Sequence, residues 1–447
     1  MIVMKFGGTS VQDAFAMRNV LSIAQEYSGQ KILMVSSACS GITSELLSIA
    51  SDSVYLNDED RIHRIQEIIK RHIDICNELG LEQGTVKQIE DIGSHLLSYC
   101  EGIALLGECT DRSQDAIASC GELFSTIILT GLLGSHLNVQ WFDARKSMKT
   151  YDLHSGAQVN MEQTSLLSNQ LLKPLFEQCD IVVTQGFIGS DDDNRTTTLG
   201  RGGSDYSAAI FGAVLEAEEI IIWTDVSGIA SADPRVIPHA RYIECMSFDE
   251  ARMLSFFGAK VLHPETILPA LQKDIPVHVR NTFKASDRGT TITRMGDEAA
   301  SGMRSVIARK PVSFVQVRAL QVSNEHSMSE LMKELEQLSG LKPMISVIID
   351  STIGLIYDVS VSKIEEYIKH LEEDNNAEIG EYALISAIGP NFRNSNSKEV
   401  VKKFHEIIHE NEESPIIFSG IQKNTLAALV NSVHAENILK ELHALCT

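Results

Sequence analysis

Apolar positions in the first part of the chain fall into two alternating patterns. Short continuous runs at 2–6 and 31–36 are typical of buried strands, whereas the stretch from Met17 to Ala24 repeats its apolar residues at helical spacing. Helical spacing returns from Ile62 to Ile73. Strands that alternate with helices need crossover connections, so this part predicts an α/β fold with a mostly parallel sheet sandwiched by helices. Further strands are expected at 139–143, 181–185, 219–223 and 275–280.

The pattern changes near residue 295. From there the order strand, helix, strand, strand, helix occurs twice, over 313–373 and over 383–445. Two copies are too few for a solenoid, so they predict two small α+β modules of ferredoxin-like type. The helices of these modules are expected at 329–338, 363–373, 398–410 and 435–445. The predicted domains are a catalytic domain at 1–295 and modules at 305–375 and 380–447.

Composition indicates a folded protein with an acidic surface. Of 447 residues, 43% are apolar and 22% charged, and 38 basic residues against 60 acidic ones give a formal charge of −22. A field of that sign repels a phosphate backbone, which argues against nucleic acid as a partner. An anionic small substrate would instead need basic residues concentrated in one site.

Localisation signals are also lacking in the sequence. The start, Met1 to Phe6, has no signal-peptide core, and no apolar run approaches membrane-spanning length, so we expect a cytoplasmic protein without a membrane partner. The eight cysteines form no C-x-x-C pair, which excludes a zinc ribbon or a thioredoxin motif. We interpret them as free thiols in a reducing compartment.

Two glycine-rich turns carry candidate phosphate chemistry. The first, Lys5 to Ser10 (KFGGTS), follows a predicted strand and precedes a helix. Its glycines would let backbone N–H groups approach a phosphate, and Lys5 would add a point charge, although the same pair of glycines also suits a plain tight turn.

The second turn runs from Thr196 to Asp205 and again feeds a helix. Ser204 suits a helix N-cap and Asp205 the first helical turn, which alone would explain both residues. Arg201, between glycines, is placed to hold a carboxylate in bidentate fashion. The P-loop and protein-kinase signatures are missing, so nucleotide chemistry here would follow another design.

Seven short motifs follow one another along the chain: KFGGTS at 5–10, VSSACSGIT at 35–43, Gly121-Glu122, TTLGRGGSD at 197–205, WTDVSG at 223–228, Asp233-Pro234-Arg235 and FGAKVLHP at 257–264. In this order they resemble the motifs of the aspartokinase family, and the C-terminal double repeat resembles its paired ACT regulatory modules. The resemblance implies the amino acid kinase fold and transfer of the ATP γ-phosphoryl to the β-carboxylate of L-aspartate. The product would be 4-phospho-L-aspartate, at the head of lysine, threonine, methionine and diaminopimelate synthesis.

The resemblance also implies roles for single residues. Lys5 and Lys260 would contact the phosphoryl group, Asp205 would orient the lysines, and Mg²⁺ would bridge the ATP phosphates. The β-carboxylate is ionised at neutral pH, so no general base is needed. Phosphate or adenosine contacts are implied for Gly7, Gly8, Ser10, Thr224, Asp225, Asp233 and Arg235.

For the amino acid, Glu122 would meet the ammonium and Arg201 the α-carboxylate. Each has a plainer alternative, since Glu122 could be an ordinary helix carboxylate and the segment Asp233 to Arg235 a common turn. The remaining positions that match the family's substrate site are Ser37, Thr43, Phe187 and Ser204.

The pattern His405-Glu406-Ile407-Ile408-His409 is that of a zinc metalloprotease helix. Apolar neighbours Phe404 and Ile408 would define the buried stripe and leave both histidines near the polar face, so we predict a solvated helix and no metal site.

Regulation is the least determined feature. Paired ACT-like modules predict a homodimer through residues 305–447 with an amino-acid effector. Asp350-Ser351-Thr352 and Ser327-Met328-Ser329 depart from lysine-sensitive patterns, which favours weak lysine inhibition or another effector.

The chain ends too soon for a fused homoserine dehydrogenase, so a monofunctional enzyme is expected. The alternatives are a kinase for another small acid and a catalytically silent amino-acid sensor.

Overall fold

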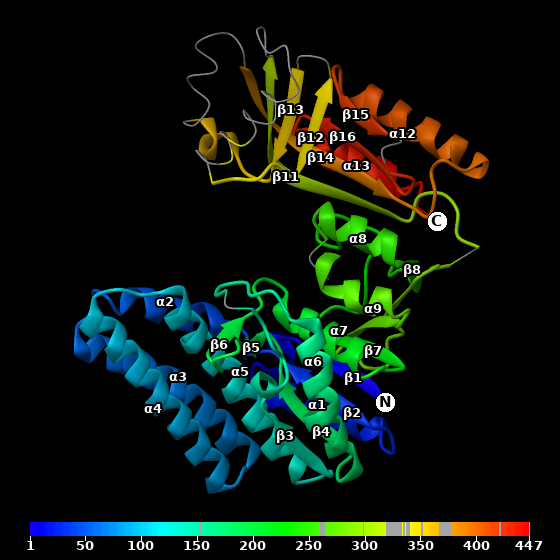
Figure 1. Cartoon of the computed structure of the whole chain (residues 1–447). Helices are drawn as coiled ribbons and strands as arrows, with labels where there is room; N and C mark the ends of the chain where they lie inside the picture. The colour runs from blue at the N-terminus through cyan, green and yellow to red at the C-terminus, as the bar shows by residue number, and fades with distance from the viewer. Residues whose placement is uncertain are drawn as a thin grey trace. The chain divides into compact units, whose positions relative to one another are not determined.

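The computed structural model describes residues 1–151, 153–259, 264–297, 299–318, 333, 336, 340–349, 352–365, 377–419 and 422–446. The chain divides into two compact units, coloured along the sequence in Figure 1. The first unit comprises Met1–Ile229, Tyr242–Arg252 and Lys260–Asp297. The second comprises Ala230–Arg241, Met253–Ala259 and Glu298–Thr447. Two short segments of the predicted catalytic domain thus belong to the second unit, and the predicted domain boundaries stay a prediction.

An eight-stranded sheet forms the centre of the first unit, in the order β3-β4-β2-β1-β7-β9-β10-β8. Every neighbouring pair is parallel except β9 and β10, so the predicted mostly parallel α/β sheet is confirmed. The strands are β1 (Ile2–Phe6), β2 (Ile32–Ser36), β3 (Val139–Phe142), β4 (Ile181–Gln185), β7 (Glu219–Thr224), β8 (Cys245–Ser247), β9 (Val277–Asn281) and β10 (Thr290–Thr293). A separate hairpin joins β5 (Ile188–Ser190) to β6 (Thr196–Thr198).

Helices cover this sheet and form a bundle beside it. Asn57 caps the long helix α3 by accepting a hydrogen bond from the Asp60 N–H, and Gly80 ends the helix in a left-handed conformation. Its fully buried face includes Ile65 and Ile68, whereas Ile73, predicted on the same stripe, is half-buried. The helices are α1 (Ala14–Glu26), α2 (Ile42–Asp52), α3 (Asp58–Leu79), α4 (Gln83–Leu106), α5 (Asp111–Gly134), α6 (Met161–Leu167), α7 (Gly203–Val214), α8 (Phe248–Phe256) and α9 (Leu268–Gln272).

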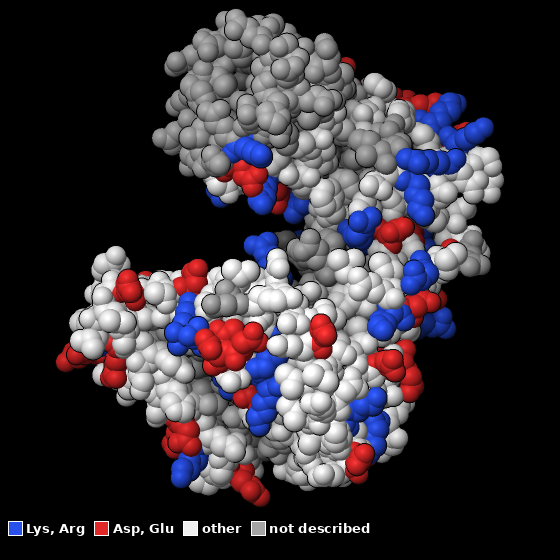
Figure 2. Space-filling view, viewed as in Figure 1, with Lys and Arg blue, Asp and Glu red and all other residues white. Residues whose placement is uncertain are grey.

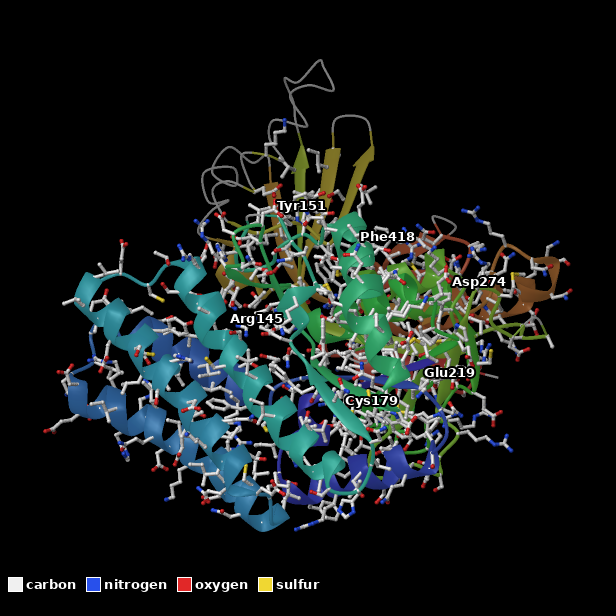
Figure 3. The ribbon with its side chains drawn as sticks, turned by 60° about the horizontal axis from the view of Figure 1, so that its bottom comes forward. Arg145, Tyr151, Cys179, Glu219, Asp274 and Phe418 are labelled. Carbon is white, nitrogen blue, oxygen red and sulfur yellow. The ribbon has the colours of Figure 1, made fainter. Side chains whose placement is uncertain are left out.

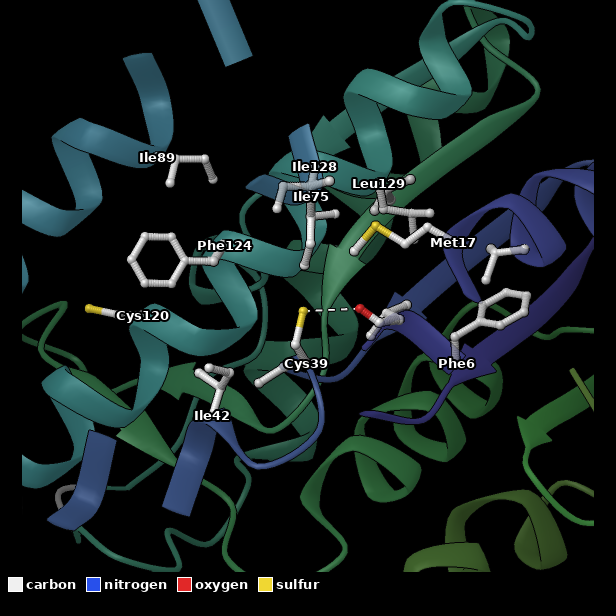
Figure 4. Packing of buried hydrophobic residues seen from close by; sticks show 14 of the residues in the cluster. Phe6, Met17, Cys39, Ile42, Ile75, Ile89, Cys120, Phe124, Ile128 and Leu129 are labelled. Carbon is white, nitrogen blue, oxygen red and sulfur yellow. Dashed lines mark hydrogen bonds between the residues drawn. The ribbon is translucent and has the colours of Figure 1, made fainter. Parts of the chain in front are cut away.

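Helix α5 lies at the centre of the core. Figure 4 shows Phe124 of this helix among apolar side chains from β1 and from α1 to α4, with the Cys39 thiol donating to the Val11 carbonyl at 3.0 Å. By length and composition α5 is apolar enough to span a membrane, so the prediction that no stretch reaches that length is wrong. Its apolar residues are interspersed with small polar ones, which hid the pattern, and most of the helix is buried inside the first unit.

The amino ends of the parallel strands lie on one side of the sheet and their carboxyl ends on the opposite side. In Figure 3, Cys179 and Glu219 mark the amino ends of β4 and β7, while Arg145, which follows β3, marks the opposite edge. Loops at the carboxyl edge of such sheets usually hold the ligand.

The second unit contains a six-stranded antiparallel sheet in the order β12-β13-β11-β14-β16-β15. Strands from both predicted modules join in it, because the first strand of each repeat pairs with the other along its length. The helices predicted at 329–338 and 363–373 lie largely outside the described residues. The remaining elements are β11 (Ser305–Arg318), β12 (Ile345–Ile349), β13 (Thr352–Tyr357), β14 (Ala377–Ile388), β15 (Ile416–Ser419), β16 (Thr425–Val430), α12 (Lys398–Asn411) and α13 (Ala435–His443).

Helix α12 carries the H-E-x-x-H pattern. Phe404 and Ile408 are buried on its inner face, whereas His409 is exposed. Over the part of the chain that the structure describes, no three His, Cys, Asp or Glu side chains cluster as metal ligands. The geometry fits a solvated helix face.

Candidate active site

The carboxyl ends of four adjacent parallel strands bring together most of the predicted site. In the strand register Phe6 of β1 lies beside Ser36 of β2 and Trp223 of β7, and Ser36 lies beside Gln185 of β4. The chain therefore leaves β1, β2 and β4 at neighbouring points into Gly7, Ser37 and Gly186, and β7 ends beside them at Thr224. Candidate acceptor residues follow β2 and β4, and candidate nucleotide residues follow β1 and β7.

A cavity of about 400 Å³ opens at this edge. All six residues predicted to bind the amino acid line it, together with three predicted for the phosphates. Those nine are Lys5, Gly8, Ser37, Thr43, Glu122, Phe187, Arg201, Ser204 and Asp205. The other lining residues, which the prediction did not single out, are Ser44 and seven residues of the motifs: Ala38, Cys39, Ser40, Gly41, Gly200, Gly202 and Gly203.

Lys5 and Asp205 form an ion pair in the lining of the cavity. The Lys5 ammonium lies 2.7 Å from Asp205 Oδ1, with both side chains mostly shielded. Lys5 comes from the end of β1 and Asp205 from the first turn of α7, so the pair joins strand and helix. Gly8 is needed beside it because a Cβ there would stand 2.9 Å from the Ala38 carbonyl oxygen.

Glu122 is a buried carboxylate with an unused oxygen. It lies on α5 at 2% exposure, its Oε1 accepts the Ala38 N–H at 3.2 Å, and its Oε2 has no hydrogen-bond partner within the described part of the chain. Burial raises the pKa of the Glu122 carboxyl to about 8, against a backbone hydrogen bond that lowers it. A buried oxygen of this kind at a cavity wall is suited to a cationic ligand group.

The glycine before Glu122 allows this approach. A Cβ at Gly121 would stand 2.8 Å from the Ala38 Cβ, so only glycine lets α5 pack closely against the loop that follows β2. This contact is the structural reason for the Gly121-Glu122 motif.

Arg201 stands on a turn made by two left-handed glycines, Gly200 at φ +75° and Gly202 at φ +72°. Its side chain is exposed, and among the described residues it has no hydrogen bond or ion pair. Gly202, and not Ser204 as predicted, is the N-cap of α7. Glycine takes this position because the backbone is left-handed there, which moves Ser204 into the first turn, facing the cavity.

Cationic groups at the cavity are few. On the face seen in Figure 2, acidic and basic side chains are interspersed. Of the residues that the structure describes, Lys5 and Arg201 are the two basic ones that line the cavity, as an anionic substrate on an acidic protein requires. Cys39 also lines it, but burial raises the pKa of its thiol to about 12, so it is not a nucleophile.

Ser10 does not reach the cavity. Its hydroxyl is buried and lies 2.7 Å from Thr282 Oγ1 and 3.3 Å from the Trp223 carbonyl, and its N–H donates to Gly7. In this structure these donors hold the turn to the ends of β7 and β9, and the role of Ser10 toward the phosphoryl group stays a prediction.

The other nucleotide candidates are placed as follows. Thr224 ends β7 and Asp225 follows it, and the Thr224 hydroxyl donates to the Asp225 carboxylate at 3.2 Å. Asp233 and Arg235 lie in the second unit and form an ion pair at 2.6 Å, and Lys260 lies outside the described residues. The structure therefore brings the acceptor set together, but not every nucleotide candidate.

Comparison with known proteins decides the family. Residues 1–281 match the amino acid kinase family. The lysine-sensitive aspartokinase 3 of Escherichia coli (strain K12) is 32% identical over 454 residues, which cover 99% of this chain and 98% of that protein. The chain belongs to the aspartokinase family. Chloroplastic aspartokinase 2 of Arabidopsis thaliana is 28% identical, over 99% of this chain and 83% of the relative.

A solved structure agrees with this membership. That of E. coli aspartokinase III in complex with aspartate and ADP superposes with a TM-score of 0.83 at 30% identity, covering 99% of each chain. The predicted family, fold class and enzyme class, an ATP-dependent kinase of the aspartokinase type, are confirmed.

Proposed function

We propose that the protein transfers the γ-phosphoryl group of ATP to the β-carboxylate of L-aspartate, giving 4-phospho-L-aspartate and ADP. The observation that carries this is one cavity lined by a buried Glu122 oxygen and the Arg201 guanidinium, both without a partner among the described residues, and by the Lys5–Asp205 pair. An α-amino acid has one ammonium and one α-carboxylate to match the first two groups. Its side-chain carboxylate is then left to face the third.

At the acceptor end of the site, side chains of opposite charge would bind the two charged groups of the amino acid backbone. The aspartate ammonium would replace the missing partner of Glu122 Oε2, and Arg201 would hold the α-carboxylate through its two-pronged guanidinium. Hydroxyls of Ser37, Thr43 and Ser204 line the same space, and Phe187 closes it with an apolar ring. These roles make the site selective for a free amino acid.

The phosphoryl end neutralises two anions. Lys5, held by Asp205, would contact the transferring group, with the turn at Gly7 and Gly8 offering backbone N–H donors. The roles of Thr224, Asp225, Asp233, Arg235 and Lys260 in holding the nucleotide stay part of the proposal.

Mg²⁺ would arrive with the nucleotide. Its oxygen ligands would come mainly from the phosphates, and Asp205 is a carboxylate that lines the cavity beside Lys5. Bound in this way, Mg²⁺ would offset the negative charge of the phosphates.

The reaction needs alignment and charge neutralisation. A β-carboxylate oxygen attacks the γ-phosphorus, the bond to the β,γ-bridging oxygen breaks, and ADP leaves with that electron pair. The attacking oxygen carries no proton at neutral pH, so no side chain has to accept one. The protein contributes by holding the two anions in line and by stabilising the charge that moves toward ADP.

Acceptor choice tests this proposal. With Mg-ATP and hydroxylamine as the trap for acyl phosphates, we expect hydroxamate from L-aspartate and little from N-acetylglutamate or carbamate. An N-acetyl group removes the ammonium that Glu122 would bind. Equal hydroxamate formation from those acids would refute aspartate as the acceptor, and no ATP consumption with any amino acid would favour a silent sensor.

The second unit is proposed to be regulatory and to join two chains. We predict a homodimer through residues 305–447 and an amino-acid effector, for which L-lysine is the first to test because the E. coli relative is named lysine-sensitive. Light scattering of the full chain should give twice the 49.2 kDa monomer mass, and activity should be measured with lysine, threonine and methionine. A monomer at working concentration would contradict the prediction.

We also propose a cytoplasmic location. All eight cysteines lie in the described part of the chain and none forms a disulfide bond there, as is expected in a reducing compartment.

A further inference from the structure

Asp115 is a buried carboxylate on α5, the helix that also carries Glu122. The proposed chemistry does not use Asp115. It lies on α5 at 2% exposure and accepts three donors from two other segments. His154 Nδ1 lies 2.8 Å from its Oδ2, Thr198 Oγ1 lies 2.5 Å from its Oδ1, and the Ser155 N–H points at both oxygens at 3.2 and 3.3 Å. A carboxylate that accepts so many bonds fixes its partners firmly.

Those partners support the turn that carries Arg201. Thr198 ends β6, three residues before Arg201, and its carbonyl accepts the N–H groups of Gly156 and Ala157 at 3.1 and 2.8 Å. A Cβ at Gly200 would stand 3.2 Å from the Gly156 Cα, so the turn rests directly on this loop. Asp115 thus holds both the strand that leads into the Arg201 turn and the loop beneath it.

The same helix carries Glu122, seven residues further along. A separation of seven residues places Asp115 and Glu122 on one face of α5, about two turns apart. One rigid helix therefore presents Glu122 to the ammonium and, through Asp115, anchors the turn of Arg201. The distance between the two charge-binding groups is set by α5.

We infer that Asp115 is a positioning residue for Arg201, which fixes where the substrate α-carboxylate is bound. This rests on the proposed function, since it concerns the site assigned to the amino acid. Without the anchor, the two left-handed glycines on either side of Arg201 would allow its backbone many conformations, and ordering it would weaken substrate binding. The effect should fall on binding of L-aspartate and spare the nucleotide.

The test is a double-mutant cycle between Asp115→Asn and Arg201→Ala, followed by steady-state kinetics. Asp115→Asn should raise the KM for L-aspartate about tenfold, with kcat and the KM for ATP changed less than about twofold. Arg201→Ala should raise the KM for L-aspartate further. The double variant should be no worse than Arg201→Ala alone, because Asp115 has nothing left to position.

Thr198→Val provides a second variant if Asp115→Asn folds poorly. It keeps the branched shape that suits β6 and removes only the hydroxyl that donates to Asp115. It should raise the KM for L-aspartate in the same direction and show the same coupling to Arg201→Ala.

Asp191→Asn is the matched control. Asp191 is also 2% exposed and stands in the turn of the same β5–β6 hairpin, but at the end away from Arg201, where its Oδ1 accepts the Arg195 N–H at 2.7 Å. It should lower the melting temperature without a selective change in the KM for L-aspartate.

Three results would separate the possible failures. If Arg201→Ala leaves the KM for L-aspartate unchanged, the proposed substrate site itself is wrong. If it raises that KM but Asp115→Asn and Thr198→Val do not, the positioning role is refuted. Effects of Asp115→Asn that add fully to those of Arg201→Ala, or that match those of Asp191→Asn, would reduce Asp115 to a purely structural role.

Discussion

Replacing Lys5 with alanine is expected to lower kcat by about two to four orders of magnitude while the KM for L-aspartate changes only a few-fold. The Lys5 ammonium lies 2.7 Å from Asp205 in a largely shielded position, where a charge acts more strongly than in water. Its interaction grows as the phosphoryl group moves between two oxygens, whereas the amino acid is held by other residues. The loss should therefore appear in kcat.

Lys31→Ala is the control for this prediction. Lys31 precedes β2 at the amino edge of the sheet, pairs with Asp180 at 2.9 Å and is half-exposed, so kcat should not change. A Lys5→Ala enzyme with normal kcat and a greatly raised KM for L-aspartate would show that Lys5 binds the acceptor.

Replacing Glu122 with glutamine should raise the KM for L-aspartate by about 100-fold and yet stabilise the free protein at alkaline pH. The amide keeps the shape of the side chain but cannot pair with an ammonium, and losing one partner of a buried charge pair costs about 3–5 kcal/mol. Kinetics at pH 8 and thermal unfolding between pH 5 and 9 would measure both effects.

The pH dependence follows from the raised pKa of Glu122, about 8 in the folded protein against a reference value of 4.5. Between those values the folded state keeps a proton that the unfolded state has released, so the stability of the wild type falls as pH rises through this range. Glutamine has no such proton. The two proteins should unfold at similar temperatures near pH 5, and the variant should be more stable by a few kcal/mol near pH 9.

Substrate binding has the opposite pH dependence. In the free enzyme Glu122 is neutral below about pH 8, so the wild-type KM for L-aspartate should rise as pH falls, and the Glu122→Gln variant should lose this dependence. Glu250→Gln is the control, since Glu250 is equally buried in the first unit and accepts the Ser247 N–H away from the cavity. It should lower stability and leave the KM unchanged. If the Glu122→Gln protein is less stable than the wild type at pH 9, the claim that the buried Glu122 charge lacks a compensating partner is refuted.

The residues predicted for the acceptor line one cavity, because most of them lie in compact motifs at strand ends. Parallel strands bring their carboxyl ends to one edge, so Ser37, Phe187 and the Arg201 turn meet once the strand order is given. The turns could be recognised from their glycine-rich local sequence, because glycine is favoured where the backbone is left-handed.

Features that depend on packing between distant segments were missed. Ser10 is a plausible phosphate ligand until β9 brings Thr282 against its hydroxyl. Nothing local marks Asp233 as part of the second unit, because that assignment comes from neighbours such as Ile237 packing with α13. Asp115 and His154 are 39 residues apart and carry no motif, so only the fold shows that they meet.

The position at which L-aspartate is phosphorylated tests the central claim most directly. The wild-type enzyme should be incubated with Mg-ATP, L-aspartate and hydroxylamine, and the hydroxamate product identified by mass spectrometry and NMR. If Glu122 and Arg201 hold the ammonium and the α-carboxylate, only the β-hydroxamate should form. The α-hydroxamate, or a mixture of the two, would mean that Arg201 does not hold the α-carboxylate and would contradict the proposed site.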